Sequence, residues 1–256
     1  MRILITGASG YVGKSLANNL QLEHSVVVLT RQDLNLADST EVKEYFKYNY
    51  FDAVIHCAVE GGHRLVADTS KVLDTNLQMY YNLVANKTSF GKLLHFGSGA
   101  DTLETPYGLS KKIIRESIKG QSNFYNLRIY AVFDEDELET RFIKSNIKNY
   151  LTNKPILLHA NKYMDFFYMQ DLITVVQYYL ETEAPPVEFD CVYRDRTSLL
   201  EISSLINNLA DYRVEIILEN NNPTQEYVGQ FIDLQLDYIG LEQGIKNTYI
   251  KLSNEY

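Results

Sequence analysis

The chain of 256 residues has little cysteine and no long apolar run. Its two cysteines, Cys57 and Cys191, each lie inside an apolar, strand-like stretch. So small a set makes no disulfide framework, and we expect buried, reduced thiols. No apolar run approaches the ~20 residues that a membrane-spanning helix requires. The first residues, MRILITG, also lack the charged start, apolar middle and cleavage site of a signal peptide. We therefore expect a cytoplasmic protein with no membrane partner.

Clustered positive charge is also missing from the chain. It has 24 Lys and Arg against 33 Asp and Glu, which gives a formal charge of -9 at pH 7. Binding to the phosphates of a nucleic acid requires clustered basic residues, so we expect no DNA or RNA partner. Neither an HxxxH nor a CxxC spacing occurs, and we expect no metal site. His56 and His95 fall inside strand-like stretches and are interpreted as hydrogen-bonded core residues.

The first two-thirds of the chain alternates short apolar runs with longer amphipathic ones. The apolar runs are β-branched or apolar almost throughout, as in a parallel sheet that is covered on both faces. The pattern predicts strands at 2–6, 25–30, 52–57, 92–96 and 124–130 and helices near 11–22, 39–48, 69–87 and 106–119. Asp38, with Glu41 three residues later, predicts a capping box for the second of these helices. The alternation predicts an α/β fold, a doubly wound parallel sheet with right-handed crossovers.

Beyond residue 133 the alternation loosens, and we expect a small second lobe. The acidic stretch DEDELE (134–139) is interpreted as a solvated loop or helix start, and Asp171 as a helix N-cap. Helices are predicted at 169–181 and 198–210, strands at 187–193 and 214–218, and a loop at 220–229. The predicted lobes are interleaved: 1–133 with about 163–193, and about 134–162 with 194–256.

A glycine-rich segment, TGASGYVG (6–13), joins the first predicted strand to the first helix. Glycines there allow a tight turn and close approach of a pyrophosphate, to which the helix N-terminus offers free N–H groups. The overlapping segment ASGYVGKS (8–15) also fits a relaxed phosphate loop of nucleotide hydrolases. Such an enzyme needs a second strand that ends in Asp to hold Mg²⁺, and no predicted strand supplies one. The segment therefore favours dinucleotide binding.

The second predicted strand ends in Thr30 and Arg31. Sites that prefer NAD usually carry an acid here for the ribose 2′-hydroxyl, whereas a neutral residue followed by Arg suits a 2′-phosphate. The sequence therefore favours NADP(H) over NAD(H). The alternative interpretation of Arg31 is an ordinary surface residue.

The segment PYGLSKK (106–112) places Tyr107 and Lys111 four residues apart, on one face of a predicted helix. A free tyrosine titrates near pH 10. An ammonium about 4 Å away, at an effective dielectric constant of ~20, contributes roughly 4 kcal/mol. That energy would bring the pKa of the phenol close to neutrality, where general acids and bases work best. The spacing predicts a tyrosine that exchanges protons near pH 7.

Six motifs, in this order over residues 1 to about 182, resemble the extended short-chain dehydrogenase/reductase family of nucleotide-sugar enzymes: TGASGYVG, VIHCAVEGG, DTNL, PYGLSKK, LRIYAVF and MDFFYMQDL. TRQDLNLAD and CAVEGGHR are most similar to its GDP-fucose synthase and dTDP-4-dehydrorhamnose reductase branches. The resemblance implies a Rossmann-type lobe that binds NADP, a small C-terminal substrate-binding lobe and a nucleotide sugar as substrate. It also implies homodimers through a four-helix bundle built from the helices near 69–87 and 106–119.

The resemblance also implies roles for single residues. Tyr107 would donate or accept the proton, Lys111 would hold the nicotinamide ribose, and Ser98 would polarise the substrate oxygen. Asn76, in DTNL, matches an asparagine near the family's active site, with helix packing as the alternative. The implied cofactor-binding residues are Gly7, Ser9, Gly10, Tyr11, Val12, Gly13, Thr30, Arg31, Asn35, Leu36, Cys57, Ala58, Val59, Tyr107 and Lys111. The expected substrate residues are Glu60, His63, Arg64, Arg141 and Arg196.

The chain departs from the family pattern in three places. Ser98 and Tyr107 are nine positions apart, where the family usually has some two dozen residues, so a loop that commonly lines the sugar pocket is missing. Gly99 and Ala100 stand where the family's 4,6-dehydratases carry two acids, and we expect no elimination of water. Met164 stands where the family often has Arg, which removes one expected diphosphate contact.

The sequence thus predicts an NADPH-dependent reductase of a nucleotide-linked keto-sugar. Two alternatives remain open at this point. One is an epimerase that retains its NAD(P), since it uses the same three side chains. The other is a catalytically silent, NADP-binding regulatory protein.

Overall fold

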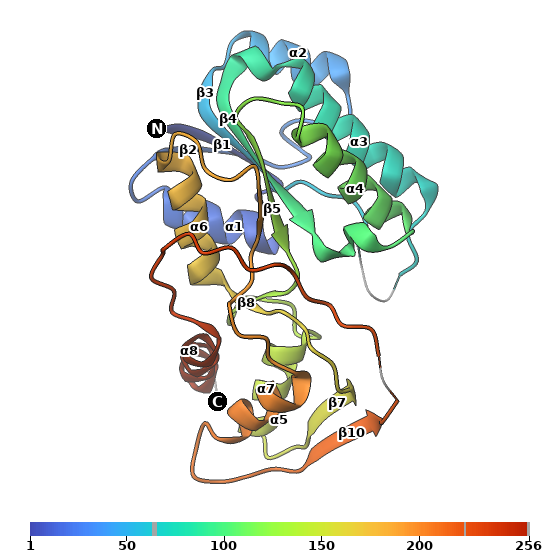
Figure 1. Ribbon diagram of the computed structural model, residues 1–256. Helices are drawn as coiled ribbons and strands as arrows, with labels where there is room; N and C mark the ends of the chain where they lie inside the picture. The colour runs from blue at the N-terminus through green and yellow to red at the C-terminus, as the bar shows by residue number, and fades with distance from the viewer. Residues whose placement is uncertain (63–65, 223, 255–256) are drawn as a thin grey trace. The chain divides into compact units, whose positions relative to one another are not determined.

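The computed structural model describes residues 1–62, 66–222 and 224–254 (Figure 1). By packing, the chain divides into two compact units. The first consists of Met1–Arg128 with Val176–Phe189, and the second of Ile129–Val175 with Asp190–Tyr256. The lobes expected from the sequence change near residues 133, 162 and 193, whereas the units change at 128, 175 and 189. The assignment of one lobe to the cofactor and the other to the substrate stays a prediction.

A six-stranded parallel sheet forms the centre of the first unit. Its order is β2-β1-β3-β4-β5-β9, so the chain passes from β1 to β2 on one side and then to β3 on the other. Such a reversal of strand order is where open α/β sheets bind ligands, outside the carboxyl ends of the strands. The strands are β1 (Arg2–Thr6), β2 (Ser25–Leu29), β3 (Phe51–His56), β4 (Phe90–Ser98), β5 (Phe124–Ile129) and β9 (Glu188–Asp190).

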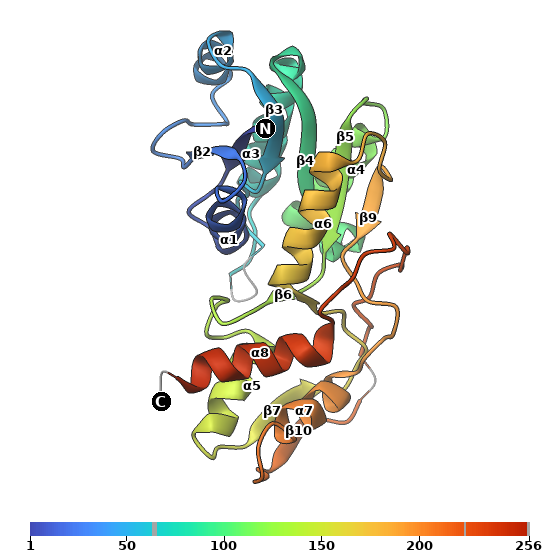
Figure 2. The same ribbon diagram turned by 90° about the vertical axis from the view of Figure 1, so that its left-hand side faces the viewer.

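Helices cover both faces of this sheet. α2 (Ser39–Lys47), α3 (Ser70–Ala85) and α4 (Pro106–Ile118) lie on one face, and α1 (Tyr11–Leu20) lies on the other, as Figure 1 and the turned view of Figure 2 agree. Short 3₁₀ helices, η1 (Lys87–Ser89) and η2 (Gly99–Thr102), precede and follow β4. The predicted α/β fold and doubly wound parallel sheet are confirmed.

The core of the first unit lies between the sheet and helices α2, α3 and α4. The strands supply aliphatic and aromatic side chains, and each such side chain contributes about 1.5–3 kcal/mol when it is fully buried. The buried members of this core include Leu4, Val42, Phe46, Phe51, Val54, Met79, Tyr80, Leu83, Phe90, Leu93, Ile114, Ile118 and Phe124. Of the predicted capping box, the cap is confirmed because the Asp38 carboxylate accepts from Thr40 N (2.8 Å) and Glu41 N (3.1 Å). The Glu41 carboxylate accepts from Asn35 N at 3.1 Å, a partner that the box does not predict.

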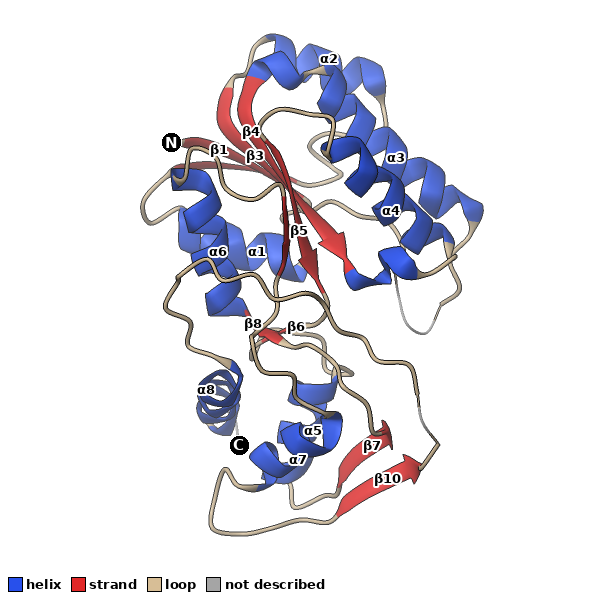
Figure 3. Cartoon of the chain, viewed as in Figure 1, coloured by secondary structure: helices blue, strands red, loops and turns tan. Residues whose placement is uncertain are grey.

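The second unit is built from helices and two small parallel sheets, β10-β7 and β6-β8 (Figure 3). Its elements are β6 (Val132–Phe133), α5 (Phe142–Leu151), β7 (Ile156–Ala160), β8 (Phe167–Tyr168), α7 (Leu199–Asn207), β10 (Ile216–Asn220) and α8 (Leu241–Ser253). Helix α6 (Met169–Glu181) begins in this unit and ends in the first. Its core includes Ile143, Ile147, Tyr150, Ile156, Leu158, Ile202, Ile206, Ile245 and Leu252.

Two interpretations of acidic residues are wrong. Within DEDELE, Asp134 and Glu137 are buried, and the Glu137 carboxylate accepts from Lys144 N at 3.1 Å. Burial raises the pKa of Glu137 to about 8, so this stretch is not simply solvated. Asp171 lies in the first turn of α6 and does not cap that helix. Its carboxylate instead accepts from Ile239 N (2.8 Å) and Gly240 N (3.0 Å), and so stabilises the start of α8.

Cys57 and Cys191 are both free thiols, as predicted, but of the two only Cys191 is buried as expected, because Cys57, just after β3, is half-buried. Of the helices in the described residues, none combines the length and the apolar character that crossing a bilayer would require.

Candidate active site

The glycine-rich segment forms a turn that only glycine fits. Gly7 adopts φ = +67°, and a Cβ on it would lie 2.5 Å from the backbone nitrogen of Ala58. A Cβ on Gly13 would lie 2.5 Å from the carbonyl oxygen of Gly7. The turn after β1 therefore packs directly against the turn after β3 and against the first turn of α1. This close packing brings two loops to the carboxyl edge of the sheet where strand order reverses.

Helix α1 begins beside this turn. Gly10 is its N-cap and makes no side-chain cap hydrogen bond. Gly10 N itself donates to Gly7 O at 3.0 Å. The first turn contains no acid. The positive end of the helix dipole therefore favours an anion here.

A cavity of about 240 Å³ opens at the ends of β1, β2 and β3. Gly7, Ser9, Gly10, Thr30, Arg31, Leu36, Cys57, Ala58 and Val59 line it, all of which the sequence assigned to the cofactor. Leu29, Leu34 and Met79 also line it, and the sequence analysis missed them. All three are apolar residues of the kind that usually packs in the hydrophobic core, so only the folded structure shows that they line a cavity. Tyr11, Val12, Gly13, Asn35, Tyr107 and Lys111 are not among the residues that line it.

The residues after β2 are held by acids. Thr30 donates to the Asp33 carboxylate from its backbone nitrogen (2.8 Å) and from its hydroxyl (2.6 Å). Both hydrogen bonds lower the pKa of Asp33, and the bond from the Thr30 hydroxyl has the larger effect. Arg31 forms an ion pair with Glu60, which lies in the turn after β3. Glu60, expected to contact substrate, thus lies beside the cofactor-like cavity.

Helix α4 begins at Pro106, as the sequence predicts. Thr105 caps it by accepting from Gly108 N at 3.0 Å, and Pro106 occupies the first turn, where its missing N–H is not needed. Lys111 lies four positions after Tyr107, and its ammonium lies 5.6 Å from the centre of the Tyr107 ring. The two side chains are therefore neighbours on α4, and their role as a catalytic pair stays a prediction.

Lys111 is buried, and its ammonium donates to the carbonyl oxygen of Phe96 at 2.6 Å. Burial lowers the pKa of Lys111 to about 8. Burial also lowers the pKa of His56 to about 3 and raises the pKa of Cys57 to about 12, so both side chains are neutral near pH 7. Within this buried group, Lys111 is the residue that carries charge at neutral pH.

The two strand histidines differ. His56 forms a hydrogen bond between its Nδ1 and the hydroxyl of Thr6, at 2.9 Å, as expected of a core histidine. His95 contacts the rings of His56 and Tyr80, but among the described residues neither of its ring nitrogens has a hydrogen-bond partner. The expectation of a hydrogen-bonded core histidine is therefore wrong for His95.

Ser98 ends β4 and is buried. Its hydroxyl oxygen accepts from Ala100 N at 3.2 Å. Helix η2 follows at once, and the chain then enters α4, so the short spacing to Tyr107 is bridged by a single turn. A Cβ on Gly108 would lie 2.4 Å from Leu103 O, so the bridging segment packs directly on α4.

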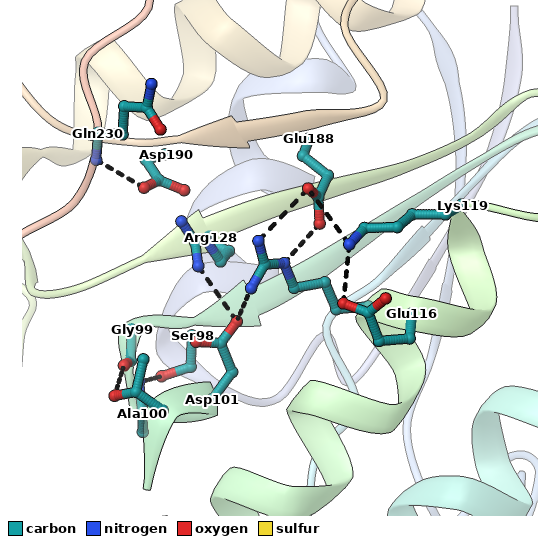
Figure 4. A network of polar contacts seen from close by, with 12 residues as sticks. Ser98, Gly99, Ala100, Asp101, Glu116, Lys119, Arg128, Glu188, Asp190 and Gln230 are labelled. Atoms are coloured by element: carbon teal, nitrogen blue, oxygen red, sulfur yellow. Dashed lines mark hydrogen bonds and ion pairs between the residues drawn. The ribbon is translucent and has the colours of Figure 1, made fainter.

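A charged network holds this short connection (Figure 4). Asp101, in η2, is buried, and one of its oxygens lies 3.3 Å from a guanidinium nitrogen of Arg115 and 3.3 Å from one of Arg128. Arg115 also donates from Nε to Glu188 at 2.5 Å. Three elements, η2, α4 and β5, are thereby joined to the strand β9. The short connection between Ser98 and Tyr107 is therefore fixed through ion pairs.

Asn76 lies in α3 and is buried. Its Oδ1 accepts from Glu60 N (2.8 Å), and its Nδ2 donates to Glu60 O (3.0 Å) and to the hydroxyl of Ser110 (3.1 Å). The turn after β3 also reaches the catalytic candidate, since a Cβ on Gly62 would lie 2.9 Å from Cε2 of Tyr107. Asn76 thus fixes the turn that flanks the Tyr107 ring.

The remaining expected substrate residues are spread over the chain. His63 and Arg64 lie outside the described residues. Arg141 is the N-cap residue of α5, in the second unit. Arg196 lines another cavity of about 240 Å³ in the second unit, together with Asp165, Tyr193, Arg194, Gly229, Gln230 and Phe231. Met164 is buried in the core of that unit.

A family model described as the NAD dependent epimerase/dehydratase family matches residues 3–190. Among curated proteins, GDP-L-colitose synthase of Yersinia pseudotuberculosis is 34% identical over 103 residues. That match covers 38% of this chain and 33% of the relative, so it spans about a third of the relative's length.

Solved structures share the fold over the whole chain. A GDP-6-OMe-4-keto-L-xylo-heptose reductase from C. jejuni matches with a TM-score of 0.77 and 17% identity, over 100% of this chain and 98% of that one. A mutant UDP-glucuronic acid 4-epimerase from Bacillus cereus matches with a TM-score of 0.81 and 16% identity, over 100% of both chains. At these identities the likeness shows the fold alone.

Proposed function

The chain belongs to the NAD dependent epimerase/dehydratase family, and we propose that it is an NADPH-dependent reductase of a nucleotide-linked keto-sugar. The observation that carries the proposal is the pairing of a buried Lys111 with Tyr107, in the same compact unit as Ser98 and the cavity at the strand ends. These are the side chains that a reduction of a carbonyl group requires.

The cavity fits a dinucleotide in its chemistry. Gly7 leaves no space for a side chain, so backbone approaches a ligand closely there, and the start of α1 offers N–H groups to a pyrophosphate. Apolar side chains of Leu34, Leu36 and Met79 line the same cavity and suit the faces of a purine base. Arg31 would hold a ribose 2′-phosphate, which favours NADP(H). When bound, the dinucleotide supplies the hydride.

Tyr107, Ser98 and Lys111 then have separate tasks. The Tyr107 hydroxyl gives a proton to the substrate oxygen as negative charge develops there. The Ser98 hydroxyl donates a hydrogen bond to the same oxygen and stabilises that charge. A positive charge about 6 Å away, at an effective dielectric constant of ~20, stabilises the resulting phenolate by roughly 3 kcal/mol. Lys111 supplies it, and its bond to Phe96 O keeps the ammonium in place.

We propose that the substrate is a nucleotide sugar. The names of the curated relative and of the reductase structure both contain a GDP-linked sugar, and the family model matches most of the first unit. In the second unit, Arg194 and Arg196 line one cavity and would pair with a diphosphate. Arg194 lies 2.8 Å from Asp233, and Arg196 lies 3.8 Å from Glu226. A diphosphate would therefore compete with these carboxylates.

The epimerase alternative uses the same three side chains, and a 4-epimerase shares the fold. The state of the dinucleotide on purification separates the two: an epimerase of this kind keeps its dinucleotide bound, whereas a reductase exchanges it at each turnover. A silent regulatory protein would have no need of the Tyr107–Lys111 pair. Dehydration is disfavoured, because Gly99 and Ala100 carry no acid and Asp101 is paired with two arginines.

The proposed assembly is a homodimer through α3 and α4. These helices pack against each other, and each exposes an apolar side chain, Tyr81 on α3 and Ile113 on α4.

The direct test is the loss of NADPH absorbance with a panel of nucleotide-linked 4-keto-sugars. We expect turnover with at least one of them and a drop in kcat of about 10²-fold or more in Tyr107→Phe, the range that a general acid contributes. Tyr48→Phe is the matched control, since Tyr48 is exposed on the same unit. Unchanged turnover in Tyr107→Phe would remove its proposed role.

A further inference from the structure

Arg31 and Glu60 form an ion pair at the edge of the cofactor-like cavity. Arg31 follows β2 and lines the cavity, and Glu60 directly follows Val59, which also lines it. The Arg31 side chain is 73% exposed and that of Glu60 38%, so solvent and ligands reach both. The nearest other acid after β2, Asp33, already accepts two hydrogen bonds from Thr30. Glu60 is therefore the carboxylate that holds the Arg31 guanidinium.

The position of Glu60 is built into the fold. Asn76, buried in α3, binds both peptide groups of Glu60, accepting from its nitrogen at 2.8 Å and donating to its oxygen at 3.0 Å. Asn76 is in turn fixed by its contact with Ser110 of α4, at 3.1 Å. A glutamate on a freely moving loop would swing away from Arg31, but this backbone is anchored to two helices. Its carboxylate consequently stays within reach of the guanidinium.

We propose that Glu60 is a specificity-determining residue that competes with the 2′-phosphate of NADP(H) for Arg31. This inference rests on the proposed function, since it concerns the dinucleotide that the reductase uses. A 2′-phosphate has to displace the Glu60 carboxylate from Arg31 and then lies near a like charge. A ribose 2′-hydroxyl carries no charge and meets neither obstacle. The pair therefore narrows the difference in affinity between the two dinucleotides, and the site binds both NADP(H) and NAD(H).

In this view Asn76 is a positioning residue. It acts through the backbone of Glu60, because its three polar contacts are to Glu60 and Ser110.

The experiment measures the Kd of NADP⁺ and of NAD⁺ for the full chain and for Glu60→Gln, Arg31→Gln and the double variant. We expect Glu60→Gln to lower the Kd of NADP⁺ about five-fold and to change the Kd of NAD⁺ less than two-fold, the scale of an exposed ion pair. Arg31→Gln should raise the Kd of NADP⁺ about ten-fold. In the Arg31→Gln background the gain from the Glu60 substitution should be clearly smaller, since only the direct repulsion between the Glu60 carboxylate and the 2′-phosphate remains. Glu44→Gln, an exposed acid of α2, removes the same charge elsewhere and is the control.

The outcomes separate this inference from the proposed function. An unchanged ratio of the two Kd values in Glu60→Gln overturns the inference, and so does an equal gain in the Arg31→Gln background. Both results leave the reductase proposal standing, because the dinucleotides still bind. Failure of every form of the protein to bind either dinucleotide overturns the proposed function and this inference together.

Discussion

Lys111 carries its charge inside the protein, and that placement has a cost in stability. The pKa of Lys111 is about 8 in the fold against 10.5 in the unfolded chain, and burial is the cause. Between these two values the unfolded chain binds more protons, so the free energy of unfolding rises with pH through this window. Below pH 8 the full penalty, about 3 kcal/mol, is present. Lys111, which we propose stabilises the Tyr107 phenolate, thus lowers the stability of the fold below pH 8.

Lys111→Met removes this penalty, and we predict that its effect depends on pH. At pH 7 the free energy of unfolding of the variant should exceed that of the wild type by about 3 kcal/mol. This difference should vanish as the pH approaches 10.5. Urea denaturation of both proteins at several pH values gives the difference directly. Lys112→Met, at the exposed neighbouring lysine, serves as control. A difference that is the same at pH 7 and pH 10 would contradict the assignment of the burial penalty to Lys111.

Gly62 shows how a backbone position bears on the side chain of Tyr107, the proposed proton donor. It adopts φ = +75°, and a Cβ there would lie 2.9 Å from the Tyr107 ring. Gly62→Ala should therefore strain the turn and displace the ring, and we predict a fall in kcat of about ten-fold or more with little change in the Kd of NADP⁺. Gly120→Ala is the control, because its Cβ would meet only Ser117 O at 3.7 Å. A normal kcat in Gly62→Ala would show that Tyr107 tolerates a shift.

At the scale of elements, the segment from β4 through η2 to α4 is short and held by charge. Asp101 holds it by pairing with Arg115 and Arg128, and its second oxygen, Oδ1, has no hydrogen-bond partner among the described residues. Asn in its place would take a charged partner from both arginines, while Arg115 keeps Glu188, so the expected cost is about 1–3 kcal/mol. We predict that Asp101→Asn destabilises the fold by that amount, measured by urea denaturation. Glu104→Gln, exposed in the same segment, should have almost no effect, and equal effects of the two would count against the network.

The same scale shows what the sequence could predict. The run AVIH forms a strand inside the parallel sheet, where both faces are covered and all four residues are buried. The run VVVL forms the edge strand β2, which is only partly buried, with Val28 47% exposed. Helix α8 was not predicted, because its sequence, LEQGIKNTYIKLS, carries Gly244 and the β-branched Thr248 in its interior. These two are buried all the same, so packing against the second unit's core overrides local preference. The interpretations of Glu137 and Asp171 are wrong because only the fold brings Glu137 to Lys144 and Asp171 to the start of α8.

At the candidate site, the residues that could be predicted from the sequence are those whose type is fixed by backbone geometry or by chemistry. Gly7, Tyr107 and Lys111 are of this kind. The sequence does not predict that Met79 lines the cavity, because an apolar side chain of this kind is expected in the hydrophobic core. The sequence analysis also assigned Glu60 to the substrate and Arg31 to the cofactor, because the two residues are 29 positions apart and only the parallel pairing of β1 with both β2 and β3 brings their turns together.

At the scale of the whole molecule, the family predicted from six short motifs is confirmed by a family model that matches residues 3–190. Two of the motifs, TGASGYVG and VIHCAVEGG, run into turns at the carboxyl edge of the sheet that close contacts constrain, whereas DTNL and PYGLSKK lie in helices α3 and α4. The later part of the chain has few such constraints, and its two small sheets and helices are set by packing. The predicted substrate-binding lobe falls in that part, and the sequence accordingly leads to a reaction class and no single sugar.

The proposed dimer is the prediction that concerns the molecule as a whole. Tyr81 is 45% exposed on α3 and Ile113 is 38% exposed on α4, and these helices pack side by side. Apolar side chains gain about 25 cal/mol for each Å² removed from water, so a second copy that covers both helices would be stabilised. Ile113→Glu should place a charge in that interface and convert the dimer to a monomer, as sedimentation velocity would show. Ile250→Glu, at an exposed isoleucine of α8, should leave the sedimentation coefficient unchanged. A wild-type chain that sediments as a monomer at micromolar concentration would refute the bundle.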